Sequence, residues 1–85
     1  DVSFSQAVFN ETNSSNYFRI FVSYVTNGGE LTQAPHPENC TNATINGING
    51  YFFEENNVTY FIYLKNGNSI EINSNQGEEL FEKIL

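Results

Sequence analysis

The stretch VTYFIYLKNGNSIEI, residues 58–72, gives the strongest indication of the fold class of this chain. Its first half has the two-residue period of a β-strand and carries large apolar side chains on both faces, with Val58, Tyr60, Ile62 and Leu64 on one and Phe61 and Tyr63 on the other. Asn66-Gly67 follows, and Asn-Gly is a strong signal for a two-residue hairpin turn. Ile70 and Ile72 then supply a returning strand. The stretch therefore predicts an antiparallel hairpin.

A second stretch of the same design is YFRIFVSYVT, residues 17–26, which ends at Asn27-Gly28-Gly29 and predicts another hairpin. It too has large apolar groups on both faces, so we expect both stretches to be central strands covered from two sides. One helix can cover only one side, which leaves the other to a second sheet or to a neighbouring subunit. Weaker strand patterns occupy residues 2–9, 31–34, 43–47 and 51–54.

The last twelve residues, SNQGEELFEKIL, change to a helical period. Asn75 and Glu78 have the spacing of a capping box. We expect a C-terminal helix over residues 76–85 that packs on the sheet, because so short a helix is unstable alone. Its apolar face consists of Leu80, Phe81, Ile84 and Leu85.

These patterns predict a mainly β protein: an antiparallel six- or seven-stranded sandwich or meander with one short C-terminal helix, with an α+β fold as the alternative. The 85 residues make one domain, 1–85. A polar loop at 10–16 separates the first strand, 1–9, from the next and makes it a candidate for exchange into a neighbouring subunit. The alternative is ordinary edge pairing within its own domain.

The charge balance excludes some classes of partner. Three basic residues oppose ten acidic ones, and the net charge of −7 repels phosphate backbones and anionic membrane surfaces. We therefore expect no nucleic-acid partner. No apolar run approaches the ~20 residues of a membrane span, so we expect none.

Five Asn-x-Ser/Thr sequons stand in stretches expected to be loops: Asn10, Asn13, Asn39, Asn42 and Asn57. They predict an extracellular or cell-surface glycoprotein that carries N-glycans. The alternative is that an Asn-rich chain forms sequons by chance. The sequence starts at Asp1 without a leader, so we expect a processed mature chain or an excised piece, with any signal peptide outside the sequence given.

Residues 35–42, PHPENCTN, form a loop that combines two prolines with two sequons and holds the only His and the only Cys of the chain. Pro35 and Pro37 forbid the helix on which His36 and Cys40 would meet. In an extended chain these two residues lie more than ~10 Å apart. One Cys and one His also supply only half of a zinc site. We expect no catalytic residues, no metal, no cofactor and no enzymatic activity.

Two residues remain open to interpretation. Cys40 is unpaired, which suggests an intermolecular disulfide, a mixed disulfide or burial. Because it is the middle residue of the Asn39 sequon, a disulfide and a glycan compete there. Arg19 lies between Tyr17 and Phe21 on one strand face, either as a cation–π shelf for a ligand or as a charge shielded by its neighbours.

The function that these patterns favour is a non-catalytic, N-glycosylated extracellular structural or surface-assembly subunit, with fibre- or pilus-like polymerisation through the terminal strand as one mode. Its partners would be further copies of itself or another extracellular protein. The alternative is a small secreted protein-binding or inhibitor module that uses an exposed aromatic face or the His36 loop.

Overall fold

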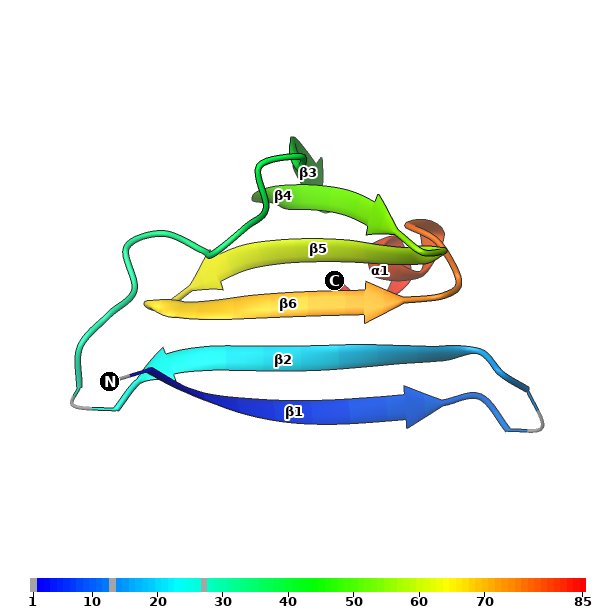
Figure 1. The fold of residues 1–85 in the computed structure, drawn as a ribbon, viewed down its shortest axis with the longest axis horizontal. Helices are drawn as coiled ribbons and strands as arrows, with labels where there is room; N and C mark the ends of the chain where they lie inside the picture. The colour runs from blue at the N-terminus through cyan, green and yellow to red at the C-terminus, as the bar shows by residue number, and fades with distance from the viewer. Residues whose placement is uncertain (1, 13, 27) are drawn as a thin grey trace.

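Six antiparallel strands form one open sheet, with a short helix on one face, in the computed structural model (Figure 1). The structure describes residues 2–12, 14–26 and 28–85. The strand order is β1-β2-β6-β5-β4-β3. This confirms the mainly β prediction with one C-terminal helix, but the described residues form a single sheet and no sandwich. The elements are β1 (Val2–Asn10), β2 (Tyr17–Val25), β3 (Thr41–Ile45), β4 (Ile48–Glu55), β5 (Val58–Lys65), β6 (Asn68–Ser74) and α1 (Glu79–Ile84).

Three tight turns, ten residues apart, join β3 to β6 as a meander. Their central pairs are Asn46-Gly47, Asn56-Asn57 and Asn66-Gly67, and all six residues have positive φ, between 51° and 82°. Positive φ at both positions defines the type I′ turn, whose twist matches that of antiparallel strands. Asn and Gly adopt this conformation at low cost. The hairpin predicted across residues 58–72 is therefore formed by β5, Asn66-Gly67 and β6.

The connection after β2 differs from the prediction. Asn27 lies outside the described residues, and residues 28–40 run as an irregular loop from β2 to β3 at the opposite edge (Figure 1). Among the described residues the next strand along the chain, β3, does not pair with β2, whose two neighbours in the sheet are β1 and β6. The strand expected at 31–34 is also absent. In the described part of the chain, the backbone bond from Leu31 N to Gly67 O, 2.8 Å long, ties this segment to the β5–β6 turn, and Pro35 directly follows it.

The core lies between the sheet and α1. It consists of Ile45, Phe61, Tyr63, Ile72 and Phe81. The helix is shorter than the range 76–85, and the capping box is wrong, because α1 has no side-chain cap. The Asn75 side chain is engaged elsewhere: its Oδ1 accepts a hydrogen bond from Tyr17 N at 3.0 Å, and its Nδ2 donates to Ser15 O at 2.9 Å. Asn75 thus fastens the β1–β2 hairpin to the end of β6.

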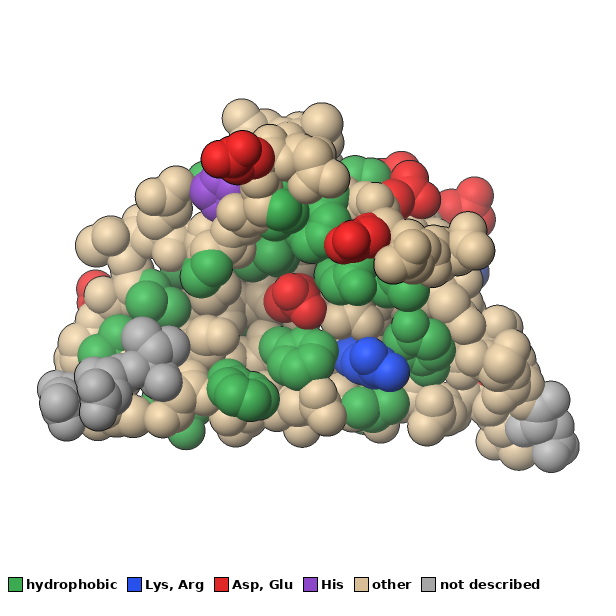
Figure 2. Space-filling model, in the orientation of Figure 1, with side chains coloured by type: hydrophobic (Ala, Val, Ile, Leu, Met, Phe, Trp, Pro, Cys, Tyr) green, Lys and Arg blue, Asp and Glu red, His purple; other side chains and the backbone are tan. Residues whose placement is uncertain are grey.

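The sheet face away from α1 is the one seen in Figure 2, where hydrophobic side chains surround acidic and basic ones. The two strands predicted to be covered on both sides, β2 and β5, differ in how deeply their side chains are buried. On β5, Phe61 faces the helix side and is fully buried, while Ile62 on the other face is 5% exposed. None of the described side chains of β2 is fully buried. The loop that carries Pro35 covers only part of this face, beside a hollow of about 350 Å³ that Phe4, Phe21 and Ile62 also line.

Candidate functional site

The β1 edge, meaning the outer side of Val2–Asn10, is a continuous row of outward-facing backbone groups. Nine register pairs join β1 to β2 without a bulge, from Val2↔Val25 to Asn10↔Tyr17. Glu11 N donates to Asn16 O at 3.0 Å and closes the hairpin in the same register. Because hydrogen-bonded pairs alternate along an antiparallel ladder, the odd-numbered residues bond β2. The even-numbered residues 4, 6 and 8 therefore direct their N–H and C=O groups away from the sheet.

The side chains described for β1 include none of the features that hinder pairing with another strand. The strand VSFSQAVFN contains no charged residue, no proline and no glycine. Phe4 is 69% exposed, Val8 44% and Phe9 47%. Natural edge strands are usually short, charged, bulged or covered, because a free edge pairs with other chains. None of these devices occurs in β1 among the residues that the structure describes.

The sequons lie mostly at the borders of the sheet. Asn39 lies in a turn and Asn57 in the β4–β5 turn, whereas Asn10 ends β1 and Asn42 lies inside β3. These four side chains are exposed, and Asn13 lies outside the described residues. The expectation that every sequon is in a loop is therefore wrong for Asn10 and Asn42, which belong to the two edge strands.

The loop at 28–40 anchors its histidine to the sheet; it ends earlier than the loop expected at 35–42, because residues 41 and 42 belong to β3. The His36 ring stacks on the Tyr51 ring, with centroids 3.7 Å apart and an interplanar angle of 16°, and its Nδ1 lies 2.8 Å from Ala34 O. Cys40 is a free, half-buried thiol, and its backbone N donates to Pro37 O at 3.3 Å in a turn. Within the described part of the chain no three His, Cys, Asp or Glu side chains gather as a metal site would need.

The sheet face away from α1, here called the open face, carries a row of aromatic contacts. The Arg19 guanidinium lies 4.8 Å from the Tyr17 ring centroid, the distance of a cation–π pair. Phe53 and Tyr60 are stacked with centroids 4.4 Å apart. Burial raises the pKa of Tyr60, and the nearby carboxylate of Glu71 raises it further, because both disfavour the phenolate. This face is apolar but also carries a cation and an anion.

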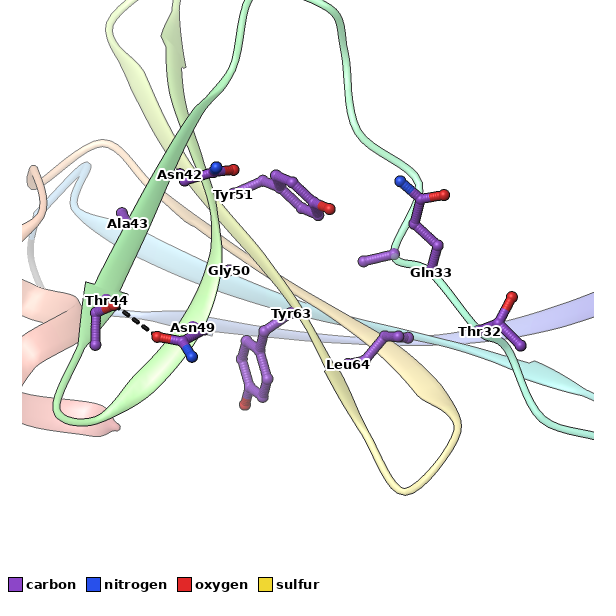
Figure 3. Close-up of a pocket in the computed structure, with 11 residues that line it drawn as sticks. Thr32, Gln33, Asn42, Ala43, Thr44, Asn49, Gly50, Tyr51, Tyr63 and Leu64 are labelled. Carbon is purple, nitrogen blue, oxygen red and sulfur yellow. Dashed lines mark hydrogen bonds between the residues drawn. The ribbon is translucent and has the colours of Figure 1, made fainter.

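A groove of about 500 Å³, here called the Tyr51 groove, opens between the β3–β4 hairpin and the loop at 32–34 (Figure 3). Tyr51 reaches from β4 toward the loop segment that carries Gln33 (Figure 3). The hydroxyl of Thr44 donates to Asn49 Oδ1 at 2.7 Å on the hairpin side. The groove is lined by Thr32, Gln33, Ala34, Asn42, Ala43, Thr44, Asn49, Gly50, Tyr51, Tyr63 and Leu64.

Sequence reasoning missed this groove. It treated Asn42 only as a sequon and Tyr51 only as part of a strand pattern. No local signal could have joined them to residues 32–34, because their proximity depends on β3 and β4 lying at the far edge of the sheet from β1.

No helix among residues 2–12, 14–26 and 28–85 has the length and apolar character needed to cross a membrane. Comparison of the chain with protein-family models, with curated proteins and with solved structures gave no significant match in any of the three.

Proposed function

We propose that this protein is a non-catalytic, N-glycosylated extracellular subunit that assembles with further copies of itself by pairing strands at the β1 edge. The observation that carries this proposal is the uncharged, nine-residue β1, whose outward backbone groups and exposed Phe4 and Val8 offer a template for another strand. The proposal differs from exchange of the terminal strand, because β1 stays paired with its own β2.

Charge supports a second copy as the partner. Each chain carries a net charge of −7, so most surfaces of two copies repel each other. A β1–β1 contact brings together two strands without charged side chains. In antiparallel pairing centred on Gln6, each Phe4 lies opposite a Val8 of the other copy, because residues whose numbers sum to 12 are partners. The same contact repeats on both sides of a two-fold axis, as in isologous dimers.

Association is tested with Gln6→Lys, which places two lysines together at the centre of a β1–β1 contact. The matched control is Gln76→Lys, since Gln76 is exposed and lies outside both edge strands. We expect sedimentation velocity to show a concentration-dependent dimer or longer polymer for the native chain and for Gln76→Lys, and monomers for Gln6→Lys. Monomers of the native chain at millimolar concentration would refute assembly through β1.

Glycosylation and location are tested separately, by the intact mass of the protein secreted from eukaryotic cells. We expect the mass to fall when N-glycans are removed enzymatically. The same measurement with and without a reducing agent shows whether Cys40 carries a disulfide to a second chain. An unchanged mass after glycan removal would refute the glycoprotein proposal.

A second candidate function is a protein-binding or inhibitor module. The observation that favours it is the hollow on the open face, lined by Phe4, Phe21, Pro35, Ile62 and Glu71 among others. Apolar side chains around a single carboxylate suit an apolar peptide that bears one basic residue. Phe21→Ser would abolish such binding and leave association of the β1 edges intact, which separates the two candidates.

A further inference from the structure

The Tyr51 groove has a lining without formal charge. Its polar groups are the amides of Gln33, Asn42 and Asn49 and the hydroxyls of two threonines and two tyrosines. Among the described residues neither a carboxylate nor a basic side chain lines it, so it offers no charged partner to an anion or to a metal cation. Amides both donate and accept hydrogen bonds, as hydroxyls do. This lining therefore matches a neutral, polyhydroxylated ligand.

The aromatic wall has the geometry for a sugar ring. The electron-rich face of an aromatic ring attracts weakly positive C–H groups, which one face of a pyranose presents. The stack with His36 holds the Tyr51 ring in place before any ligand arrives. The bond from Thr44 likewise orients the Asn49 amide, so its NH₂ group faces away from Thr44. At about 500 Å³ the groove also falls in the size range of small-ligand sites.

Asn42 itself can supply the sugar. Asn42 and Tyr51 are direct cross-strand partners in the β3–β4 ladder, so their Cβ atoms are separated by only about 4.5–5.5 Å and point to one face. Figure 3 shows the Asn42 amide lying beside the Tyr51 ring. Asn42 is exposed and begins the sequon Asn42-Ala43-Thr44. A glycan attached to its Nδ2 therefore starts at the mouth of the groove.

We propose that the Tyr51 groove is a binding site for a neutral sugar ring, and that the first sugar of a glycan on Asn42 occupies it, packed against Tyr51. This inference rests on the proposed glycoprotein function. The seated glycan covers the outer side of β3, so it closes one edge of the sheet to strand addition while the β1 edge stays open.

The test uses the full chain secreted from eukaryotic cells, with occupancy of each sequon read by peptide mass. Ring currents of Tyr51 should shift protons of the first Asn42 sugar upfield in the NMR spectrum. The glycan on Asn57, which lies in the β4–β5 turn, is the internal control and should show no such shift. Enzymatic removal of the Asn42 glycan should lower the Tm by about 4 °C, the change expected for a contact of under ~1 kcal/mol.

Two variants separate the sugar contact from general stability. Tyr51→Leu removes the aromatic wall and should abolish both the upfield shift and the Tm difference. His36→Ala removes the stack behind Tyr51 but leaves the ring, so the shift should persist even if the loop at 32–34 loosens. An occupied Asn42 whose sugar protons are unshifted in the native chain would overturn the proposal.

A second arm distinguishes the attached sugar from a free one. The unglycosylated Asn42→Gln chain is titrated with N-acetylglucosamine and its short oligomers while backbone amide resonances are followed. If native Asn42 proves to be unoccupied, resonance shifts confined to Tyr51, Gln33 and their neighbours would show that the groove binds a free sugar. If native Asn42 is unoccupied and no such shifts are seen, the groove is not a sugar site. If no sequon carries sugar at all, the glycoprotein proposal fails, and this titration still decides the groove.

Discussion

The two edge strands of the sheet, β1 and β3, both have backbone groups without a partner strand on their outer side, but they differ in length and in surroundings. β1 is nine residues long and uncharged, and its side chains are exposed from Phe4 to Asn10. β3 has five residues, follows a loop with two prolines and carries a sequon at Asn42. β3 also contributes Ile45, which is 4% exposed, to the core, whereas no described side chain of β1 is buried.

One edge of this sheet has features that hinder the addition of a strand, whereas the described residues of the other edge have none of them. A short strand beside a proline-containing loop offers few groups for pairing, and a glycan would remove those. A molecule with a single usable edge closes into pairs, whereas one with two usable edges continues into a fibre. If the proposed assembly through β1 takes place, the β3 edge decides whether it stops at a dimer.

The largest effect should follow from truncating the buried side chain of β3. Ile45→Ala should lower the free energy of unfolding by about 2–4 kcal/mol, through lost apolar burial and a residual cavity. Phe4→Ala on β1 removes more atoms but should cost less than about 0.5 kcal/mol in the monomer, because Phe4 is 69% exposed. Urea denaturation of both variants checks the comparison. A cost of 2 kcal/mol for Phe4→Ala would mean that β1 is covered in solution.

Gly50 holds β4, and with it β3, close to β5. A Cβ at Gly50 would lie 2.5 Å from Ile62 O and 2.8 Å from the Phe61 ring. Gly50→Ala should therefore cost about 1–3 kcal/mol, since backbone and a buried ring must move.

Gly47→Ala is the control for that substitution. A Cβ at Gly47 meets nothing within 4 Å, and its φ of +82° adds only local strain, about 1 kcal/mol. Thermal unfolding of the two variants should rank Gly50→Ala as the more damaging. The reverse order would place β4 farther from β5 than the structure has it.

Proline substitutions at neighbouring positions should show which side of β1 is free. Ala7→Pro removes an N–H that bonds β2 and should cost about 1 kcal/mol more than Gln6→Pro, which removes an outward N–H. Gln6→Pro should also reduce association, because the lost donor belongs to the free edge. Equilibrium unfolding and sedimentation of both variants measure these effects. Equal losses of unfolding free energy would contradict the assignment of the odd-numbered residues of β1 to hydrogen bonds with β2 and of the even-numbered ones to the free edge.

The smallest effect is a loss of stability at alkaline pH. Burial raises the pKa of Tyr63, in the core, above the ordinary value of 10.0. The folded state thus holds this proton more tightly than the unfolded chain, so the contribution is complete below pH 10.0 and declines as the pH rises through the folded-state pKa. Tyr63→Phe should flatten this decline in pH-dependent denaturation curves. An unchanged slope would mean that other groups cause it.

Much of the fold follows from local sequence. Alternation in residues 17–26 and 58–65 predicts two strands, and Asn66-Gly67 predicts the turn between β5 and β6, because pleat period and turn geometry are properties of a few adjacent residues. The same reasoning finds the C-terminal helix, whose Phe81 is fully buried. It could not foresee that Asn75 would bind the β1–β2 hairpin rather than cap the helix, since Ser15 and Tyr17 lie about sixty residues away.

Local sequence patterns locate the six strands and most of the turns, and they also predict a strand at 31–34 that does not form in the described structure. The acidic charge and the number of sequons are likewise read from the sequence alone. Which strands become the edges depends on the tertiary structure. β2 and β5 both carry large apolar side chains on two faces, yet among the described residues only β5 has buried ones, because burial depends on neighbours that pair from distant parts of the chain. The Tyr51 groove has the same origin: residues 32–34 and 42–51 meet only because the loop after β2 crosses to the far edge of the sheet.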